Sequence, residues 1–386
     1  VDTYFKYCHG QPYSMFHEET FRSDLSRSIL PPYLILAIVA STLRYSQDPC
    51  YKGSLCSASN EFAAQAWRAI LVECFESESG PDYRTVQGTI LLAIHQFVGC
   101  NYRTAWIRIG MAISIAQSLN LMSEPPNLAN STREEHRRTL WSIYMLDRLG
   151  TCGTSRTGLF PDSALRLRLP CPENTFRDCL PNDSPTLKVL NESPADQLGN
   201  VSALARVILL TSTLSCIAGF SLQQSWQTQI ESPWTHNSEY AKLITRLDSL
   251  STYFDKRQAF DPTSWSSGGR EDSNEIALCI FSHILYHLCY CILQHPFVLK
   301  RRHGPNDAPF PSDFLSNSLQ NNWQHAQDLT HTLSYATQKK MPTWSSFYAY
   351  CSLVAGTINC LHCLSAEESI QKMSELAVQM SFLFLD

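Results

Sequence analysis

The stretch "STREEHRRTLWSIYMLDRLGTCGTSRTGLFP", from Ser131 to Pro161, decides the fold class. Charged residues open it, and an apolar run from Leu140 to Leu146 follows, in which only Ser142 and the Tyr144 hydroxyl are polar. The pattern lacks the alternation of a strand and ends at glycines, so it predicts a helix whose second half is buried on most sides.

The start of this helix carries two overlapping capping signals. Thr132 followed by Glu135 predicts a capping box, and Ser131 with Glu134 offers the same arrangement one residue earlier. Glu134 also precedes Arg137 and Arg138 by three and four residues, a spacing that brings side chains together on a helix. We therefore expect the first turns to form a charged surface that supports the helix.

Asp147 stands near the end of the same helix, where the helix dipole disfavours a negative charge. The adjacent Arg148 points away from it, because neighbouring helical residues do not face each other. Arg156 and Arg108 are the candidate partners, and we expect a charge network that fixes the loop after the helix. The alternative is an exposed, unpaired aspartate.

The composition describes a folded protein rather than a disordered one. Of the 386 residues, 44% are hydrophobic and 17% are charged, which leaves ample material for a core. The formal charge is −5, with 30 basic against 35 acidic residues, so this chain is not expected to carry its own nucleic-acid surface. The 15 cysteines are scattered along the chain and lack the regular spacing of the disulfide framework of a small secreted domain. This distribution favours a protein of a reducing compartment.

Helical periodicity dominates the rest of the chain, and the prediction is an all-α array of antiparallel helices. A very short break at Gly99 predicts a helical hairpin, and prolines with polar residues predict long loops near 170–200, 261–275 and 303–315. No convincing membrane span is present. Further helices are expected at 31–45, 59–75, 84–98, 101–121, 198–224, 239–256, 276–295, 316–339, 343–364 and 366–385.

Cysteines and histidines recur every four residues on one of these helices. The series is Cys279, His283, His287, Cys291 and His295, and neighbours at this spacing share a face that could bind zinc. The favoured interpretation is a packed helix, because a structural zinc site needs four ligands and the sequence shows no further set. The pair Cys360 and Cys363 is a lone CxxC and weak evidence of a site.

At this point the sequence resembles a known family, the fungal-specific transcription factor domain, which is the middle homology region of fungal binuclear zinc-cluster regulators. "EEHRRTLWSIYMLDR" is similar to its signature helix, and "LPPYLILAIVASTLRYS" to its first long helix. "GTSRTGLFPDSALRLRLPCPE" resembles the loop that usually carries Gly-Arg-Pro, here replaced by Ser155-Arg156-Thr157. The resemblance is strong from Tyr4 to about Arg177 and looser beyond.

The resemblance implies a non-catalytic regulatory domain acting in RNA polymerase II transcription in the nucleus. It implies a motif-bearing half at 1–177, a linker at 178–200 and a helical half at 201–386 packed on the first. Members usually carry a six-cysteine zinc cluster that reads DNA. Cys8, Cys50 and Cys56 cannot make it, so we expect a fragment with no cofactor in this chain, and with zinc in the absent N-terminal cluster.

The partners implied are DNA through that absent module, a second copy in a homodimer, and a small-molecule effector or a coregulator protein; no membrane is implied. The alternatives are an all-helical enzyme of the isoprenoid-synthase type, which needs an acidic metal-binding cluster that is not visible, and a peptide-binding scaffold, which predicts a repeat period. The residues expected to form the structural signature, with no catalytic, cofactor or metal role, are Glu134, Arg137, Arg138, Trp141, Asp147, Arg148 and Arg156.

Overall fold

The computed structural model describes residues 1–124, 127–154, 156–192, 201–222, 232–257, 273–302 and 311–385. Within these ranges the chain is built from helices, and the one β-type contact is an isolated bridge between Arg168 and Thr186. The all-α prediction is therefore confirmed. The chain divides into one unit of residues 1–150, 158–192 and 201–208, and another of 151–157, 193–200 and 209–386.

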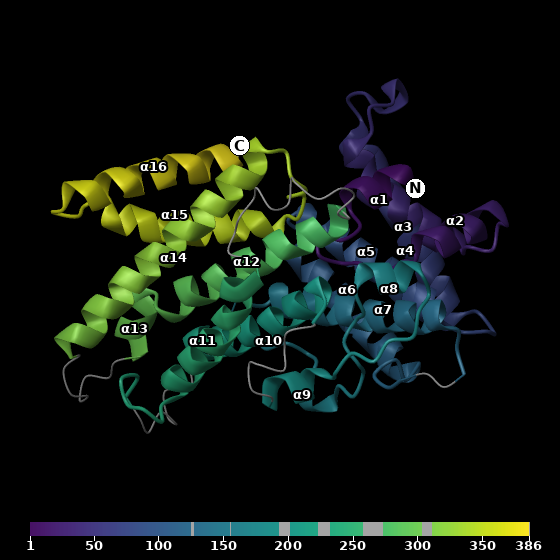
Figure 1. The fold of residues 1–386 in the computed structure, drawn as a ribbon. Coiled ribbons are helices and arrows are strands. Elements are labelled where there is room, and N and C mark those ends of the chain that lie inside the picture. The colour runs from purple at the N-terminus through teal and green to yellow at the C-terminus, as the bar shows by residue number, and fades with distance from the viewer. Residues whose placement is uncertain are drawn as a thin grey trace. The chain divides into compact units, whose positions relative to one another are not determined.

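In the first unit α7 (Asn130–Leu149) packs against two long helices, α5 (Tyr83–Val98) and α6 (Tyr102–Ser118). Helices α5 and α6 pack against each other as the predicted hairpin, and α3 packs on both α4 and α5 (Figure 1). Gly88 on α5 permits this close approach, because a Cβ there would lie 3.3 Å from both Ile70 and Tyr33. The helices are α1 (Asp2–Tyr7), α2 (Glu18–Ser26), α3 (Pro32–Thr42), α4 (Leu55–Phe75), α5 (Tyr83–Val98), α6 (Tyr102–Ser118), α7 (Asn130–Leu149), α8 (Glu173–Arg177) and α9 (Leu187–Glu192).

The second unit is a set of helices that packs around α12 and α14. The α14 helix contacts α12, α15 and α16, and α15 packs along α16 (Figure 1). The helix α10 (Ala203–Leu222) begins in the first unit and continues in the second. The others are α11 (Glu239–Arg257), α12 (Ser273–Leu293), α13 (Pro296–Arg302), α14 (Ser312–Gln338), α15 (Phe347–His362) and α16 (Glu368–Leu385).

Helix α7 begins earlier than its capping signals predict, so the capping-box expectation is wrong. The helix starts at Asn130, its N-cap is Ala129 and no side chain caps it. Ser131, Thr132, Glu134 and Glu135 thus lie inside the helix. The reason is tertiary: Glu135 accepts a hydrogen bond from the backbone N–H of His17 at 2.8 Å instead of reaching back along its own helix.

The predicted loops differ from the structure at their edges. The segment 170–200 holds two short helices, α8 and α9, before residue 193. Helix α12 starts at Ser273 and α14 at Ser312, each a few residues before the predicted loop end. The remainder of the 261–275 prediction and residues 303–310 of the last one lie outside the described residues.

Two helices in the described part of the chain are long and apolar enough to cross a membrane by length and composition. They are Ala203–Leu222 and the segment Ser273–Lys300. Their most apolar windows are 78% and 83% buried inside the protein, as expected of helices in a protein core. The candidates are therefore weak evidence for a span.

Candidate functional site

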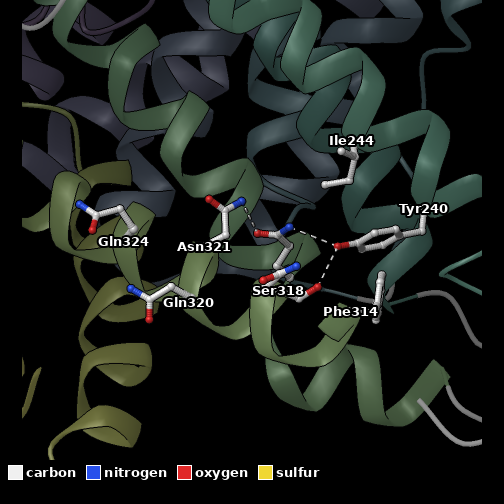
Figure 2. A pocket seen from close by; sticks show the side chains of 9 residues that line it. Tyr240, Ile244, Phe314, Ser318, Gln320, Asn321 and Gln324 are labelled. Atoms are coloured by element: carbon white, nitrogen blue, oxygen red, sulfur yellow. Dashed lines mark hydrogen bonds between the residues drawn. The ribbon is translucent and has the colours of Figure 1, made fainter. Parts of the chain in front are cut away.

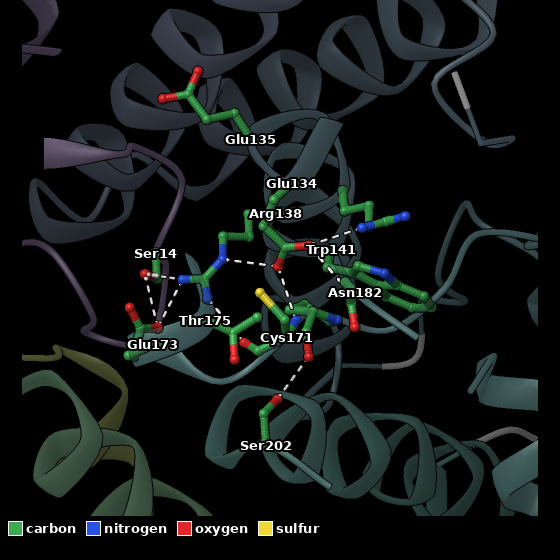
Figure 3. A network of polar contacts seen from close by, with 12 residues as sticks. Ser14, Glu134, Glu135, Arg138, Trp141, Cys171, Glu173, Thr175, Asn182 and Ser202 are labelled. Atoms are coloured by element: carbon green, nitrogen blue, oxygen red, sulfur yellow. Dashed lines mark hydrogen bonds and ion pairs between the residues drawn. The ribbon is translucent and has the colours of Figure 1, made fainter. Parts of the chain in front are cut away.

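Arg138 on α7 is the centre of a buried polar network in the first unit (Figure 3). Its guanidinium is fully buried and donates to Glu134 Oε1 at 3.1 Å, to Glu173 Oε1 at 2.7 Å and to Ser14 Oγ at 2.8 Å. The fourth contact is to the carbonyl of Cys171 at 3.0 Å. One side chain thus joins the N-terminal segment, α7 and the segment that leads into α8.

Glu134 connects this arginine to a second ion pair. Its carboxylate also accepts from Arg137 at 3.1 Å and from the Cys171 amide at 2.9 Å. Arg137 in turn donates to Glu124 at 2.6 Å and 2.8 Å. The network therefore alternates charge, and a buried charge is tolerated when it is paired and hydrogen-bonded in this way.

The protonation states follow from this pairing. Burial alone would lower the pKa of Arg138, but Glu173 and Glu134 outweigh it and raise the pKa above the usual arginine range. Burial alone would raise the pKa of Glu173, but Arg138 and His9 hold it below its ordinary value. Both groups are therefore charged at neutral pH, and each stabilises the other's charged form.

These positions correct the expectation of a charged surface at the start of α7. Glu134, Arg137 and Arg138 are 3%, 4% and 0% exposed. The predicted contacts of Glu134 with both arginines are confirmed. The sequence of α7 alone could not predict this burial, because the groups that cover the three side chains come from residues 14, 124 and 171–173.

Trp141 lies one turn further along α7 and is fully buried. Its indole N–H donates to the carbonyl of Arg168 at 2.8 Å, and its ring meets Tyr144 edge to face at 5.3 Å between centroids. The Arg168 amide donates to Glu124 at 3.1 Å. The tryptophan therefore fills volume and fixes the strand-like segment that carries Arg168.

Glu135 is a second buried carboxyl on α7, on the side of the helix that meets α5. It accepts from the His17 amide at 2.8 Å and from the Tyr83 hydroxyl at 3.4 Å. Burial raises the pKa of Glu135 to about 7, and the His17 amide and Arg84 oppose that shift only in part. The folded protein thus holds a proton here that the unfolded chain releases at lower pH.

We expect stability to fall as pH rises from about 4.5 to about 7 because of this group, since the folded state binds more protons there than the unfolded state. Glu135→Gln keeps an oxygen for the His17 amide and removes the charge. At about pH 8 it should be more stable than the parent, on the order of 2 kcal/mol, with the gain vanishing below about pH 4.5. Urea unfolding of both proteins across pH measures this. A pH-independent difference between them would contradict it.

Asp147 and Arg148 hold the loop that follows α7. Asp147 is fully buried, and its carboxylate accepts from the amides of Leu159 at 2.8 Å and Phe160 at 3.3 Å. Arg148 donates to Asp162 at 2.9 Å and to the carbonyl of Phe160. The alternative of an exposed, unpaired aspartate is therefore wrong. The expectation that Asp147 helps to fix the loop is met through backbone amides, and Arg148, which was not expected to take part, holds the same loop through Asp162.

Gly158 sits where this loop returns to the helix end. A Cβ at that position would lie 2.9 Å from both the Arg148 guanidinium carbon and the Asp147 carboxylate. Arg108, one of the two predicted partners of Asp147, instead donates to the carbonyl of Leu92 at 3.0 Å and lies 4.5 Å from the Trp67 ring centre. Close backbone approach, rather than that arginine, satisfies the carboxylate.

Asp147→Ala should lower the free energy of unfolding by about 2 kcal/mol, because it leaves the buried Phe160 amide and the part-buried Leu159 amide without their acceptor. Asp147→Asn keeps one acceptor oxygen and should lose less. Chemical unfolding monitored by circular dichroism measures both. The matched control is Asp178→Ala, an exposed aspartate, with an expected change within about 0.5 kcal/mol. An equal loss of unfolding free energy in Asp178→Ala would contradict the claim that the contacts of Asp147 stabilise the fold.

Six of the seven predicted signature residues belong to the first unit. Arg156 belongs to residues 151–157, which are part of the second unit, and it is exposed. Sequence reasoning missed Ser14, Glu124 and Glu173, which are the partners of the buried arginines. Glu173 ends the quoted loop motif directly after Pro172, which is the one signal that could have pointed to it.

A pocket of about 660 Å³ lies in the second unit between α11, α14 and the end of α12 (Figure 2). Its inner wall is a chain of hydrogen bonds. Asn321 donates to Gln294 at 2.9 Å, Gln294 donates to the Tyr240 hydroxyl at 3.2 Å, and Tyr240 lies 3.5 Å from Ser318. The wall carries amides and hydroxyls with no charged group, which suits a neutral polar ligand. The lining residues are Tyr240, Ile244, Gln294, Phe314, Asn317, Ser318, Gln320, Asn321 and Gln324.

Three imidazoles and a carboxylate meet between α12 and α14 in the same unit. His287 Nδ1 lies 2.8 Å from His325 Nδ1 and 4.0 Å from an Asp328 oxygen, and its Nε2 lies 3.2 Å from His283 Nε2. Burial lowers the pKa of His325 and of His283 to about 4. Burial, together with the two neighbouring imidazoles, lowers the pKa of His287 well below its ordinary value. Neutral imidazoles and a carboxylate are metal-ligating groups.

Comparison with known proteins places the chain among fungal regulators. Residues 1–255 of the 386 match the family described as the Fungal specific transcription factor domain. The chain is 22% identical to the Zn(2)-C6 fungal-type transcription factor FTF1c of Fusarium oxysporum, with all of this chain and 43% of that protein aligned. It is 24% identical to an uncharacterized transcriptional regulatory protein of Schizosaccharomyces pombe, with 74% of this chain and 31% of that protein aligned.

The chain thus spans less than half the length of these relatives. No solved structure matches it. The profile match covers most of the chain and includes the whole of α7 and the loop it holds. The chain belongs to the family of the fungal specific transcription factor domain.

Proposed function

We propose that this chain is the non-catalytic regulatory part of a zinc-cluster transcription factor that controls RNA polymerase II transcription in the nucleus. The observation that carries the proposal is the family match over residues 1–255. Relatives aligned along the whole chain are named Zn(2)-C6 fungal-type transcription factors, and this chain covers less than half of the length of each. DNA reading and its zinc would therefore belong to a part of such a protein outside this chain.

The structure supports two separate roles within the domain, one for the signature residues and one for the pocket. The residues of the signature, Arg138, Glu134 and Trp141 among them, are buried and committed to contacts within the first unit. They hold the fold and are not available to a ligand. The neutral pocket around Tyr240 and Gln294 is open to a small polar molecule, and we assign it as the effector site of the proposed regulator.

Regulation through this pocket requires two conformations that the effector binds unequally. A coregulator protein, a second copy of the chain or the activation segment of the same polypeptide would then respond to the preferred conformation. Hydroxyl- or amide-rich molecules fit the lining, because its donors and acceptors are uncharged.

A tethering assay tests the proposal. The chain is fused to a DNA-binding module with a known target site, and reporter transcript is measured against the module alone. We expect the fusion to change transcript several-fold, in either direction. The same fusion with Gln294→Leu tests the pocket, since that change removes the central amide of its wall. An expressed, nuclear fusion with the output of the module alone would contradict the proposal.

The chain alone should not bind DNA sequence-specifically. Its formal charge of −5 gives no overall basic footprint, and phosphate contacts supply much of the affinity in protein–DNA complexes. Fluorescence anisotropy with a labelled duplex pool at moderate salt measures this, with binding expected to be weak and abolished by added salt. Tight, salt-resistant binding of the chain to one DNA sequence in the pool would contradict the assignment of DNA recognition to another part of the protein.

A further inference from the structure

The histidines of α12 acquire, in the folded second unit, the partners that the sequence did not reveal. His325 and Asp328 are three residues apart on α14, so they share a face of that helix, and that face meets His283 and His287. One ligand atom from each of His287, His325 and Asp328 lies within 4.8 Å of the others. These four side chains are called the α12–α14 cluster below.

The spacing of the three ligand atoms matches what a small divalent ion needs. Zinc–nitrogen and zinc–oxygen bonds of about 2.1 Å at tetrahedral angles place the ligand atoms about 3.4 Å apart. The observed separations, 2.8 Å between the two Nδ1 atoms and 4.0 Å from His287 Nδ1 to Asp328, bracket that value. Binding one ion would require the two Nδ1 atoms to move slightly apart and the Asp328 carboxylate to move closer.

We propose that His287 Nδ1, His325 Nδ1 and the Asp328 carboxylate bind a divalent transition-metal ion of the zinc class, with His283 orienting His287 from behind. Two imidazoles and one carboxylate form a ligand set that zinc uses with a fourth position left open. The carboxylate is 43% exposed, which leaves a route from solvent for the ion and for water at the open position.

The surrounding residues hold the ligands in the orientation this requires. Tyr290 stacks on His325 with ring centroids 4.0 Å apart and planes 10° apart, and its hydroxyl donates to Asp248 at 2.7 Å. Gln324 donates to the other oxygen of Asp328 at 3.1 Å. His283 Nε2 can accept the Nε2–H of His287, which fixes the tautomer that presents Nδ1 to the metal. A carboxylate or imidazole with such a second contact is typical of protein metal sites.

The binding step needs no redox partner. In the metal-free protein one proton lies in the short contact between the two Nδ1 atoms. The ion displaces that proton from Nδ1 of His325, and the proton returns through solvent to Nε2 of the same ring. Both imidazoles therefore stay neutral, and each Nδ1 donates its lone pair to the metal. Because only three protein ligands are present, the ion should be exchangeable, and it should link α12 to α14 when bound. Gln324, which donates to the metal ligand Asp328, also lines the effector pocket, so the proposed metal site and that pocket share this residue.

The test uses the whole purified chain, stripped with a chelator and titrated with Co²⁺ under reducing conditions. We expect one Co²⁺ per chain, with visible bands of a nitrogen–oxygen site, no thiolate charge-transfer band, and displacement by Zn²⁺. His325→Ala and Asp328→Asn should abolish this binding, and His283→Gln should weaken it by about 10- to 100-fold. His236→Ala removes an exposed imidazole from the same unit and should leave it unchanged.

Each other outcome overturns the proposal. A thiolate band would place the metal on cysteines, and unchanged binding in Asp328→Asn would exclude the α12–α14 cluster. If the parent chain bound Co²⁺ no more tightly than His325→Ala does, there would be no metal site at the α12–α14 cluster. The metal-free variants are compared by circular dichroism. Asp328→Asn preserves the shape of a half-exposed side chain, so it gives an answer even where His325→Ala is poorly folded.

Discussion

Replacing Arg138 by alanine should cost about 3–5 kcal/mol of unfolding free energy, because it leaves the buried Glu173 without its cation and Glu134 with Arg137 as its remaining one. Glu134 and Glu173 are 3% and 10% exposed as side chains, and both meet the guanidinium at 3.1 Å or less. The Cys171 carbonyl and the Ser14 hydroxyl lose their donor at the same time. The measurement is urea unfolding followed by circular dichroism.

Two further variants show that the loss comes from the network. Arg138→Lys keeps the charge but cannot reproduce the forked contacts to Glu134 and Glu173, so it should also be clearly destabilised. Arg166→Ala removes an exposed arginine of the same unit and should change stability by less than about 0.5 kcal/mol. A loss in Arg138→Ala no larger than that in Arg166→Ala would contradict the account of α7.

Trp141→Ala should lower the free energy of unfolding by a similar amount, about 3–5 kcal/mol, because removal of a fully buried indole leaves a large cavity. Trp141→Phe fills most of that volume but leaves the Arg168 carbonyl without its donor, so it should lose a smaller amount, about 1–3 kcal/mol. Thermal and urea unfolding measure both variants. Equal losses in the two would mean that packing contributes little, which would contradict the burial of this residue.

Local sequence periodicity predicted the long helices but not the short ones, which are α1, α2, α8, α9 and α13. The Gly99 break, the small residues of α6 and the apolar run from Leu140 to Leu146 each describe one helix and its nearest neighbour. Such patterns depend on residues a few positions apart, so one sequence contains the whole signal. Helix ends were less well predicted, as the start of α7 shows, because Glu135 is used by His17 rather than by its own helix.

The candidate sites depended on contacts that a single helix does not contain. The spacing of Glu134, Arg137 and Arg138 predicted their mutual contacts but not their burial, because Glu124 and Glu173 are supplied by other segments. The histidines of α12 were equally visible, yet their partners His325 and Asp328 lie about 40 residues away on α14. In both cases the sequence identified one side of the site and the fold supplied the other.

The central claim is that the α7 signature serves to hold the regulatory domain together through the Arg138–Glu173 contact. The coupling free energy from a double-mutant cycle of Arg138→Ala and Glu173→Ala tests it most directly. We predict that the two changes are strongly non-additive, with a coupling of about 2–3 kcal/mol. Arg138→Ala leaves the buried Glu173 without its cation, and Glu173→Ala leaves Arg138 to share Glu134 with Arg137. Additive losses, with a coupling below about 0.5 kcal/mol, would contradict the claim.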